Sequence, residues 1–215
     1  MTCRSGRPLF LVGFMGSGKT TLGQALATAL GIPFVDLDDE ICRRAGADSV
    51  NDIFARQGEA AFRVLETATL RDIVQASADT ETHPDDTTAA ASKSGMTVSD
   101  ARQTTSPAVP AAIIACGGGT PCHADNMDVM LQGGTVVWLD ADEDRLVQRL
   151  TIYGDSRPLV RNLDPEQLRR YIQQTLAQRS AYYGRAHARF DSSRLEDAEQ
   201  VAASVRLFID TIIYF

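Results

Sequence analysis

The chain has 215 residues, of which 44% are apolar and 23% are charged, and this balance excludes a wholly disordered or fibrous protein. That length suits a single domain, 1–215, with or without an insertion, better than two independent cores. The formal net charge is −7 and no run of Lys or Arg interrupts the sequence, which argues against nucleic acid or an acidic membrane surface as a partner.

Short apolar runs alternate with amphipathic stretches along the whole chain. Strands are predicted at 9–13, 34–36, 111–116 and 135–139, with a weaker fifth at 188–191. Helices are predicted at 19–30, 38–45, 59–75, 123–131, 142–150, 164–183 and 197–213. Strands that are apolar throughout and separated by helices form parallel sheets covered on both faces, so the pattern predicts a doubly wound α/β fold. Ligands of such folds bind at the carboxyl ends of the strands.

The phosphate-binding signal lies at residues 13–20, which read Gly-Phe-Met-Gly-Ser-Gly-Lys-Thr. They satisfy GxxxxGK[ST] directly after a predicted strand and directly before a predicted helix. Glycines let such a loop turn its N–H groups onto phosphate oxygens, and the helix points its positive end at them. Lys19 can reach the β- and γ-phosphates and the Thr20 hydroxyl can ligate Mg²⁺. The motif leaves a kinase, a GTPase switch and a motor ATPase open.

An acidic pair follows the second predicted strand. Because strand side chains alternate, Asp36 and Asp38 are expected to point the same way, toward the phosphates. One carboxylate can then serve the metal while the other holds or deprotonates an acceptor hydroxyl. The alternative is that Asp38 or Asp39 only caps the next helix.

A second cluster combines an arginine with two acids. Glu59, Arg63 and Glu66 lie on one face of a predicted helix through i+4 and i+3 spacing. The spacing alone leaves two interpretations equally open, a surface ion pair or an anchored guanidinium that binds a substrate carboxylate. The triple glycine 117–119, at the carboxyl end of the third predicted strand, lets a ligand approach the backbone closely.

Residues 77–109 interrupt the α/β pattern, since they contain no aromatic residue, Leu or Ile and are rich in Ser and Thr. They bury too little apolar surface to offset chain ordering, so we expect a low-complexity, disordered insertion. It enters at the amino end of the third strand, opposite the expected site. A tolerated surface loop is favoured over an interaction tail.

Together, these motifs resemble the shikimate kinase family. The resemblance is carried, in order, by Gly13 to Thr20, Asp36-Leu37-Asp38, Ile53-Phe54, Gly58-Glu59, Phe62-Arg63 to Glu66, Gly117-Gly118-Gly119, Arg157-Pro158-Leu159 and Arg179 before Tyr182. It implies a three-layer P-loop NTPase fold with five parallel strands in the order 2-3-1-4-5. It also implies ATP-dependent phosphorylation of the 3-hydroxyl of shikimate, on the pathway to chorismate and the aromatic amino acids.

The resemblance assigns a role to each matching residue. Lys19, Asp38 and Arg157 would be catalytic, with Asp38 as the candidate base and Arg157 in a lid at 152–163. Thr20 and Asp36 would serve Mg²⁺. The nucleotide would be bound by Gly13, Gly16, Ser17, Gly18, Lys19, Thr20, Thr21, Arg157 and Arg194, the last in the loop that borders the adenine. The acceptor, held by helices within 37–76, would contact Asp38, Phe54, Phe62, Arg63, Gly117, Gly118, Gly119 and Arg179.

Some features depart from the family pattern. Family members often carry an arginine shortly before the lid. The corresponding position here is Leu150 or, with a one-residue shift, Arg149, so the role of that arginine is left unassigned. Pro121 and Cys122 are not part of the general pattern, and His123 is interpreted as a helix-start residue. The four scattered cysteines lack CxxC spacing, which predicts reduced thiols rather than disulfides or zinc.

The remaining expectations concern the binding partners, the cellular localisation and the oligomeric state of the protein. No apolar run approaches the ~18 residues that a membrane-spanning helix needs, so we expect a cytoplasmic protein without a membrane partner. A monomer is expected because no long exposed apolar stripe is evident. Two alternatives stay open: a kinase for another small hydroxy acid or a nucleoside monophosphate, and a nucleotide-dependent binding module that uses the insertion.

Overall fold

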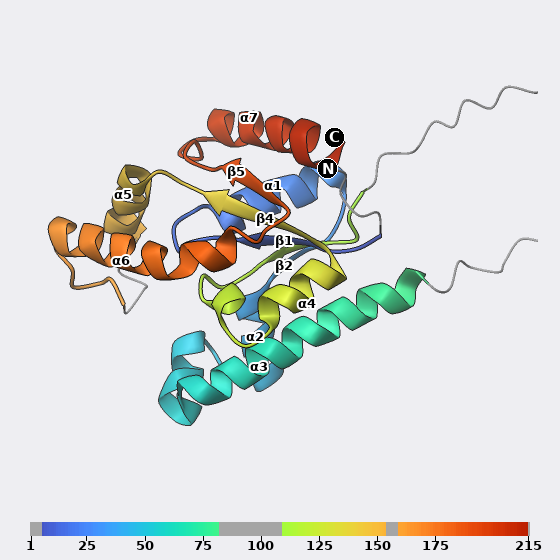
Figure 1. Cartoon of the computed structure of the whole chain (residues 1–215), viewed down its shortest axis with the longest axis horizontal. Helices are drawn as coiled ribbons and strands as arrows, with labels where there is room; N and C mark the ends of the chain where they lie inside the picture. Colours follow the sequence, from blue (N-terminus) through green and yellow to red (C-terminus); the bar gives the residue numbers. More distant parts are fainter. Residues whose placement is uncertain (1–5, 82–108, 154–158, 215) are drawn as a thin grey trace, which may run out of the picture.

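The computed structural model describes residues 6–81, 109–153 and 159–214 of the chain. Within these ranges a parallel sheet lies between two helical layers, and two further helices extend beyond one end of the sheet (Figure 1). Most of the predicted insertion, residues 82–108, lies outside the described residues, and so does the part of the predicted lid that contains Arg157.

The sheet has five parallel strands in the order β2-β3-β1-β4-β5, which confirms the expected fold class and strand order. Its strands are β1 (Leu9–Val12), β2 (Phe34–Asp36), β3 (Ile113–Ala115), β4 (Thr135–Asp140) and β5 (Ala188–Asp191). The central strand β1 is apolar and buried throughout because helices cover both of its faces.

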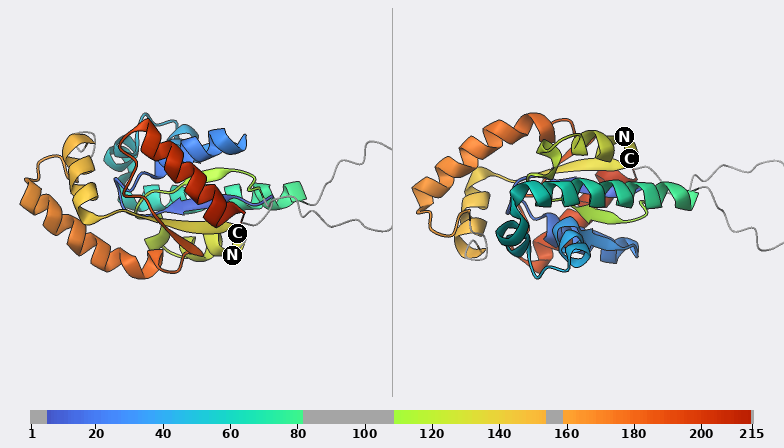
Figure 2. Two further views of the ribbon diagram at one scale, coloured as in Figure 1. Left: turned by 90° about the horizontal axis from the view of Figure 1, so that it is seen from above. Right: turned by 90° about the horizontal axis from the view of Figure 1, so that it is seen from below.

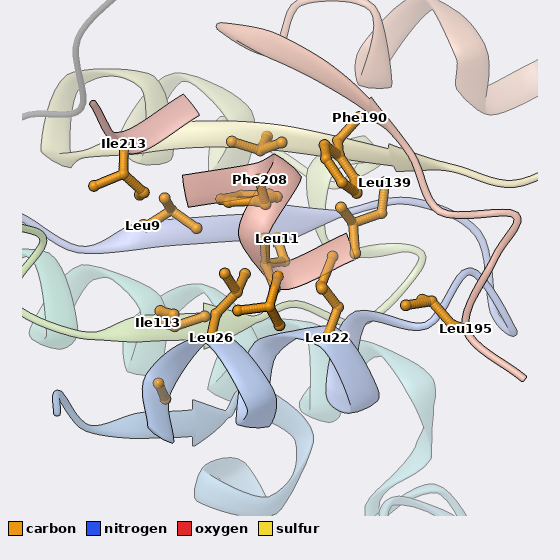
Figure 3. Close-up of a cluster of buried hydrophobic side chains, with 13 residues drawn as sticks. Leu9, Leu11, Leu22, Leu26, Ile113, Leu139, Phe190, Leu195, Phe208 and Ile213 are labelled. Carbon is orange, nitrogen blue, oxygen red and sulfur yellow. The ribbon is translucent and has the colours of Figure 1, made fainter. Parts of the chain in front are cut away.

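Alternation along β1 divides the core between the two faces. Leu9 and Leu11 pack with α1 (Lys19–Leu30) and α7 (Ala198–Phe208), in the cluster shown in Figure 3. Phe10 and Val12 pack on the opposite face with α3 (Val50–Glu81), α4 (Asn126–Gly133) and part of α6 (Pro165–Tyr183). In Figure 2, the view from above shows α7 and α1 on one side of the sheet, and the view from below shows α3 lying across the other side. The sheet is thereby held from both sides.

A third apolar cluster lies beyond the carboxyl end of the sheet. There α5 (Glu143–Tyr153) and α6 pack against Phe14 of the phosphate loop, and the side chains of Leu146, Leu150 and Ile172 are buried between them. The phosphate loop therefore packs against apolar side chains through Phe14 and is not surrounded by solvent on that side.

Several helix boundaries differ from those predicted. Helix α2 (Leu37–Ala45) begins one residue early because Asp36 caps it. A 3₁₀ turn, η1 (Thr120–Cys122), delays α4, so His123 precedes that helix instead of starting it. After Phe208 the chain continues as a π-helical turn, η3 (Ile209–Ile213), rather than as α-helix. Helix α5 runs to Tyr153, into the segment predicted to be lid.

Helix α3 differs most from its prediction, 59–75. It starts at Val50, where a short apolar repeat of Val50, Ile53 and Phe54 is interrupted by Gly58, and it continues to Glu81, which makes the first residues of the predicted insertion helical. Once a helix has formed, each added residue gains a hydrogen bond, so polar residues such as Ser77 can extend it. None of the helices in the described ranges is both long and apolar enough to cross a membrane.

Gly58 divides α3 into two arms. Its φ of 81° and ψ of 167° lie in a region that only glycine adopts readily, and they bend the helix between Phe54 and Phe62. The bend brings the rings of these two phenylalanines to 5.0 Å centroid separation in an edge-to-face arrangement. The conformation of Gly58 therefore sets the position of Phe62 and of Arg63 next to it.

We predict that Gly58→Ala destabilises the protein by about 1 to 3 kcal/mol through backbone strain alone. A Cβ at this position would meet no atom within 4 Å, so steric contact contributes nothing. Urea unfolding checks the prediction, with the exposed helical neighbour Gln57→Ala as the control, expected to stay within about 0.5 kcal/mol of the wild type. Equal stability of Gly58→Ala and the wild type would show that the bend is not imposed by Gly58.

Candidate active site

The phosphate loop joins β1 to α1 and depends on three glycines with positive φ. Gly13, Gly16 and Gly18 have φ values of 142°, 80° and 87°, which L side chains rarely adopt. A Cβ at Gly13 would also lie 2.3 Å from the Leu139 carbonyl oxygen of β4. The loop can therefore curl over the sheet end only with glycine at this position.

Lys19 lies over the loop that precedes it. Its Nζ donates to the carbonyl oxygens of Gly13 and Phe14 at 2.9 and 2.8 Å, which places the ammonium group beside the loop that would surround a phosphate. Ser17, between the glycines, is almost fully buried. The loop has the geometry expected from its sequence.

Asp36 and Asp38 both lie near the loop, but not for the reason that the sequence suggested. Only Asp36 belongs to β2, and its Oδ1 accepts the Asp38 backbone N–H at 3.1 Å as the N-cap of α2. Strand alternation therefore does not align the pair, and neither Asp38 nor Asp39 is the cap. The other carboxylate oxygen of Asp36, Oδ2, accepts the Thr20 hydroxyl at 3.1 Å, so one side chain caps α2 and contacts the residue after Lys19.

Asp38 lies in an environment that disfavours its charge. Burial, followed by the negative charges of Asp36 and Glu66, raises the pKa of Asp38 to about 6, while the positive charge of Lys19 acts in the opposite direction. A Cβ on Gly117 would lie 3.0 Å from Asp38 Oδ1, so this carboxylate touches the start of the triple-glycine turn. A carboxyl group with a pKa near neutrality, next to a phosphate loop, suits proton abstraction.

Arg63 is an anchored guanidinium rather than a surface ion pair. Its Nη1 donates to Glu66 Oε2 at 2.8 Å, and its Nη2 donates to Glu59 Oε1 at 3.3 Å. The Glu66 side chain is 1% exposed, and its other oxygen accepts the hydroxyl of the fully buried Thr120 at 2.5 Å. Glu66 thus ties the arginine on α3 to the turn after β3, which favours the second of the two interpretations left open by the sequence.

The triple-glycine turn is where the loop and the arginines meet. A Cβ on Gly118 would lie 3.3 Å from Arg179 Nη1 and 3.4 Å from the Gly13 carbonyl oxygen, and one on Gly119 would lie 2.9 Å from Arg63 Nη2. Within the described ranges, no hydrogen bond uses the backbone N–H of Gly118 or Gly119. The turn therefore offers donor groups between two guanidinium groups and the phosphate loop.

The predicted apolar wall is formed by residues on both sides of the bend in α3. Phe62 is 3% exposed and packs in the core, whereas Phe54 is 37% exposed. The guanidinium carbon of Arg63 lies 5.5 Å from the centroid of the Phe62 ring, close enough for a cation–π contact. Phe62 therefore supports Arg63, and Phe54 keeps an exposed apolar surface.

A cleft of about 650 Å³ runs along the phosphate loop to the acidic pair and the first two glycines of the turn. Among the predicted residues it is lined by Gly16, Gly18, Lys19, Thr20, Thr21, Asp36, Asp38, Gly117 and Gly118. Leu195 and Glu196 line it where Arg194 was expected. The exposed Arg194 is not among its lining residues.

Arg149 is a lining residue whose role the sequence left unassigned. Its guanidinium donates to the carbonyl oxygens of Gly16 and Ser192 at 3.1 and 3.0 Å, and to Glu196 Oε1 at 2.9 Å. Arg149 therefore joins the phosphate loop, 133 positions earlier in the sequence, to the 192–196 loop. Its alternative, Leu150, also lines the cleft, but its side chain is buried in the apolar cluster behind the loop, so of the two only Arg149 brings a charged group to the cleft.

The cysteines in the described ranges are unpaired, as predicted: Cys42, Cys116 and Cys122 form no disulfide. Cys3 lies outside the described residues. Burial raises the pKa of the Cys122 thiol, while the charges of Arg179 and Arg63 act in the opposite direction.

This fold and site define a class, the P-loop phosphotransferases that act on a small acceptor, because the phosphate loop lies near a carboxylate, Asp38, and near two arginines beside the triple-glycine turn. The family described as "Shikimate kinase" matches residues 15–80 and 101–210. The chain belongs to the shikimate kinase family. The break in the match, at 81–100, falls within the predicted insertion.

Curated relatives and solved structures agree with this assignment. The shikimate kinase of Bacteroides fragilis is 34% identical over 198 residues, covering 92% of this chain and 92% of that protein. The crystal structure of shikimate kinase from Bacteroides thetaiotaomicron has a TM-score of 0.75 at 32% identity, covering 95% of this chain and 97% of that one. The Acinetobacter baumannii enzyme, solved in complex with shikimate, has a TM-score of 0.67 at 28% identity, covering 94% and 91% of the two chains.

We predict that kcat/KM falls below about pH 6, since Asp38 with a pKa of about 6 must lose its proton before it can act as a base. Glu66 raises that pKa, so Glu66→Gln shifts the acid limb of the pH profile to lower pH, whatever its effect on the plateau. Asp39→Asn is the matched control, because this exposed carboxylate has a smaller effect and should shift the limb less. An acid limb that stays in place in both variants would remove Asp38 as the titrating base.

Proposed function

We propose that the chain transfers the γ-phosphoryl group of ATP to the 3-hydroxyl of shikimate, giving ADP and shikimate 3-phosphate, on the pathway to chorismate and the aromatic amino acids. One observation carries this proposal. The triple-glycine turn contacts the phosphate loop through Gly118 and Gly13, and the same turn contacts Arg63 and Arg179. A triphosphate and a carboxylate can therefore be bound on adjacent surfaces.

The acceptor is bound through its carboxylate and its hydroxyl. In the proposal, Arg63 and Arg179 bind the carboxylate, Gly117, Gly118 and Gly119 donate backbone N–H groups, and Phe54 and Phe62 contact the ring. Fixed guanidinium groups suit a planar anion because they can donate two parallel hydrogen bonds. An uncharged acceptor would leave this pair poorly used. The phosphate of a nucleoside monophosphate also pairs with guanidinium groups, so the acceptor panel below decides between that class and shikimate.

The transfer itself needs little covalent chemistry from the protein. The 3-hydroxyl oxygen forms a bond to the γ-phosphorus, the bond from that phosphorus to the bridging oxygen of ADP breaks, and the hydroxyl proton passes to Asp38. Gly13, Gly16, Ser17, Gly18 and Thr21 hold the phosphates with Lys19, which neutralises charge on them. Arg157, outside the described residues, and Arg194 keep their predicted nucleotide roles as part of this proposal.

The residues beside Lys19 fit Mg²⁺. The Thr20 hydroxyl and the Asp36 carboxylate lie 3.1 Å apart, and such hard oxygen donors are those that Mg²⁺ prefers. We propose that Thr20 is a direct ligand and that Asp36 acts through water, and bound Mg²⁺ would neutralise charge on the nucleotide. We further propose that the enzyme is a cytoplasmic monomer that binds neither nucleic acid nor membranes.

The decisive measurement is coupled ADP release from ATP·Mg with shikimate, beside a panel of other hydroxy acids and nucleoside monophosphates. We predict that Arg63→Ala and Asp38→Asn each lower shikimate-dependent kcat/KM by at least about 100-fold while nucleotide binding persists. Arg56→Ala removes an exposed arginine from the same helix and should change kcat/KM by less than about twofold. Wild-type turnover in both site variants, or preference for another acceptor, would overturn the proposal.

A separate prediction concerns the metal. Thr20→Ala should raise the Mg²⁺ concentration needed for half-maximal activity by at least about tenfold, because one oxygen donor is lost. Thr28→Ala, on the exposed face of the same helix, is the control and should leave the Mg²⁺ titration unchanged. An identical Mg²⁺ requirement in both variants would argue against Thr20 as a ligand.

A further inference from the structure

Tyr183 is a buried side chain at the end of α6 to which no role has been assigned above. Its ring is fully buried and packs against Trp138 at 5.8 Å between ring centroids. Its hydroxyl donates to the Gly118 carbonyl oxygen at 2.6 Å. Tyr182, the tyrosine that carried the family resemblance, is instead 39% exposed.

The same hydroxyl also interacts with an arginine of the site. Arg179 lies one helical turn before Tyr183 on α6, and its Nη1 is 3.3 Å from where a Cβ on Gly118 would stand. Burial raises the pKa of Tyr183 to about 12, and the charge of Arg179 and its hydrogen bond to the phenol act in the opposite direction. The phenol therefore stays protonated at neutral pH and donates to Gly118, and the Arg179 side chain lies beside the same glycine.

The bond to the Gly118 oxygen also orients the next peptide group. A trans peptide is planar, so its C=O and the following N–H point in opposite directions. No cis peptide occurs in the described ranges, so the bond from Tyr183 directs the Gly119 N–H away from the phenol. One hydroxyl thus determines the direction of a backbone donor that lies beside the Arg179 guanidinium group.

The two arginines are held in chemically different ways. Arg63 is paired with the carboxylates of Glu66 and Glu59. In the described part of the chain, no carboxylate forms a salt bridge with Arg179, whose guanidinium lies beside Gly118, the residue that the neutral phenol contacts. Arg179 therefore keeps a positive charge that is not compensated by a bonded acid, which favours an incoming carboxylate.

We propose that Tyr183 is a positioning residue for the acceptor carboxylate, acting through the Gly118–Gly119 peptide and Arg179. The inference rests on the proposed function, because it assigns the carboxylate to these groups. Tyr183 contacts neither the nucleotide loop nor Asp38 in this scheme, so its effect is confined to acceptor binding.

The test is steady-state kinetics of Tyr183→Phe, which keeps the ring and removes the hydroxyl. We expect the KM for shikimate to rise roughly tenfold, since the part-buried Gly118 carbonyl loses its partner and the Gly119 N–H beside Arg179 loses its orientation, while the KM for ATP changes by less than about twofold. Tyr182→Phe removes an exposed hydroxyl next to it and should change neither constant. Trp138→Phe loosens the ring packing but keeps the hydroxyl, and it should leave the KM for shikimate near that of the wild type.

The outcomes separate this inference from the function on which it rests. Absence of shikimate-dependent ADP release from the wild-type enzyme would overturn the proposed function. An active wild type with an unchanged KM for shikimate in Tyr183→Phe would overturn the role of Tyr183 alone. Equal rises in both KM values with a lowered melting temperature, or the same kinetic effect from Trp138→Phe, would show a merely structural role and also overturn it.

Discussion

Strands β1 and β3 are hydrogen-bonded neighbours with Leu11 opposite Ala115, so the phosphate loop and the triple-glycine turn leave the sheet at the same level. Their backbones then approach closely enough that a Cβ on Gly118 would meet the Gly13 carbonyl oxygen at 3.4 Å. Side chains on these residues would separate the two loops, and with them the nucleotide and the acceptor. In-line transfer requires the two reactants to be held at contact distance, so the glycines limit how far apart they can be.

Charge compensation is the second constraint on the site. A buried carboxylate such as Glu66 is costly unless it is paired, and here it is bonded to Arg63 and Thr120. That arrangement fixes Arg63, yet the same negative charge raises the pKa of Asp38. In the proposed reaction, acceptor binding and proton abstraction are therefore coupled, because Glu66 both fixes Arg63 and raises the pKa of Asp38, the candidate base. Tyr183, a neutral phenol bonded to Gly118 close to Arg179, adds no further negative charge to this crowded region.

The sequence predicted the parts of the site that depend on local spacing. The phosphate loop has a fixed number of residues between a strand and a helix, so Lys19 and Thr20 could be assigned directly, and the sheet order followed from the family resemblance. Contacts between distant segments could not be predicted in this way. The role of Arg149 depends on its bonds to Gly16 and Ser192, which no local pattern records. The positions of Asp36 and Asp38 were anticipated for the wrong reason, since helix capping and not strand alternation aligns them.

The structure also shows where the chain leaves and re-enters the fold on either side of the predicted insertion. Val109 accepts a hydrogen bond from Gly6, and Ala111 donates one to Arg7, so the chain re-enters the fold beside the residues that precede β1. Helix α3 ends at the same side of the molecule, away from α5 and α6 (Figure 1). Both attachment points therefore lie at the amino end of the sheet, whereas the phosphate loop and Gly117–Gly119 follow the carboxyl ends of β1 and β3. The chain can therefore be longer at this point without entering the site, because both attachment points lie at the opposite end of the sheet.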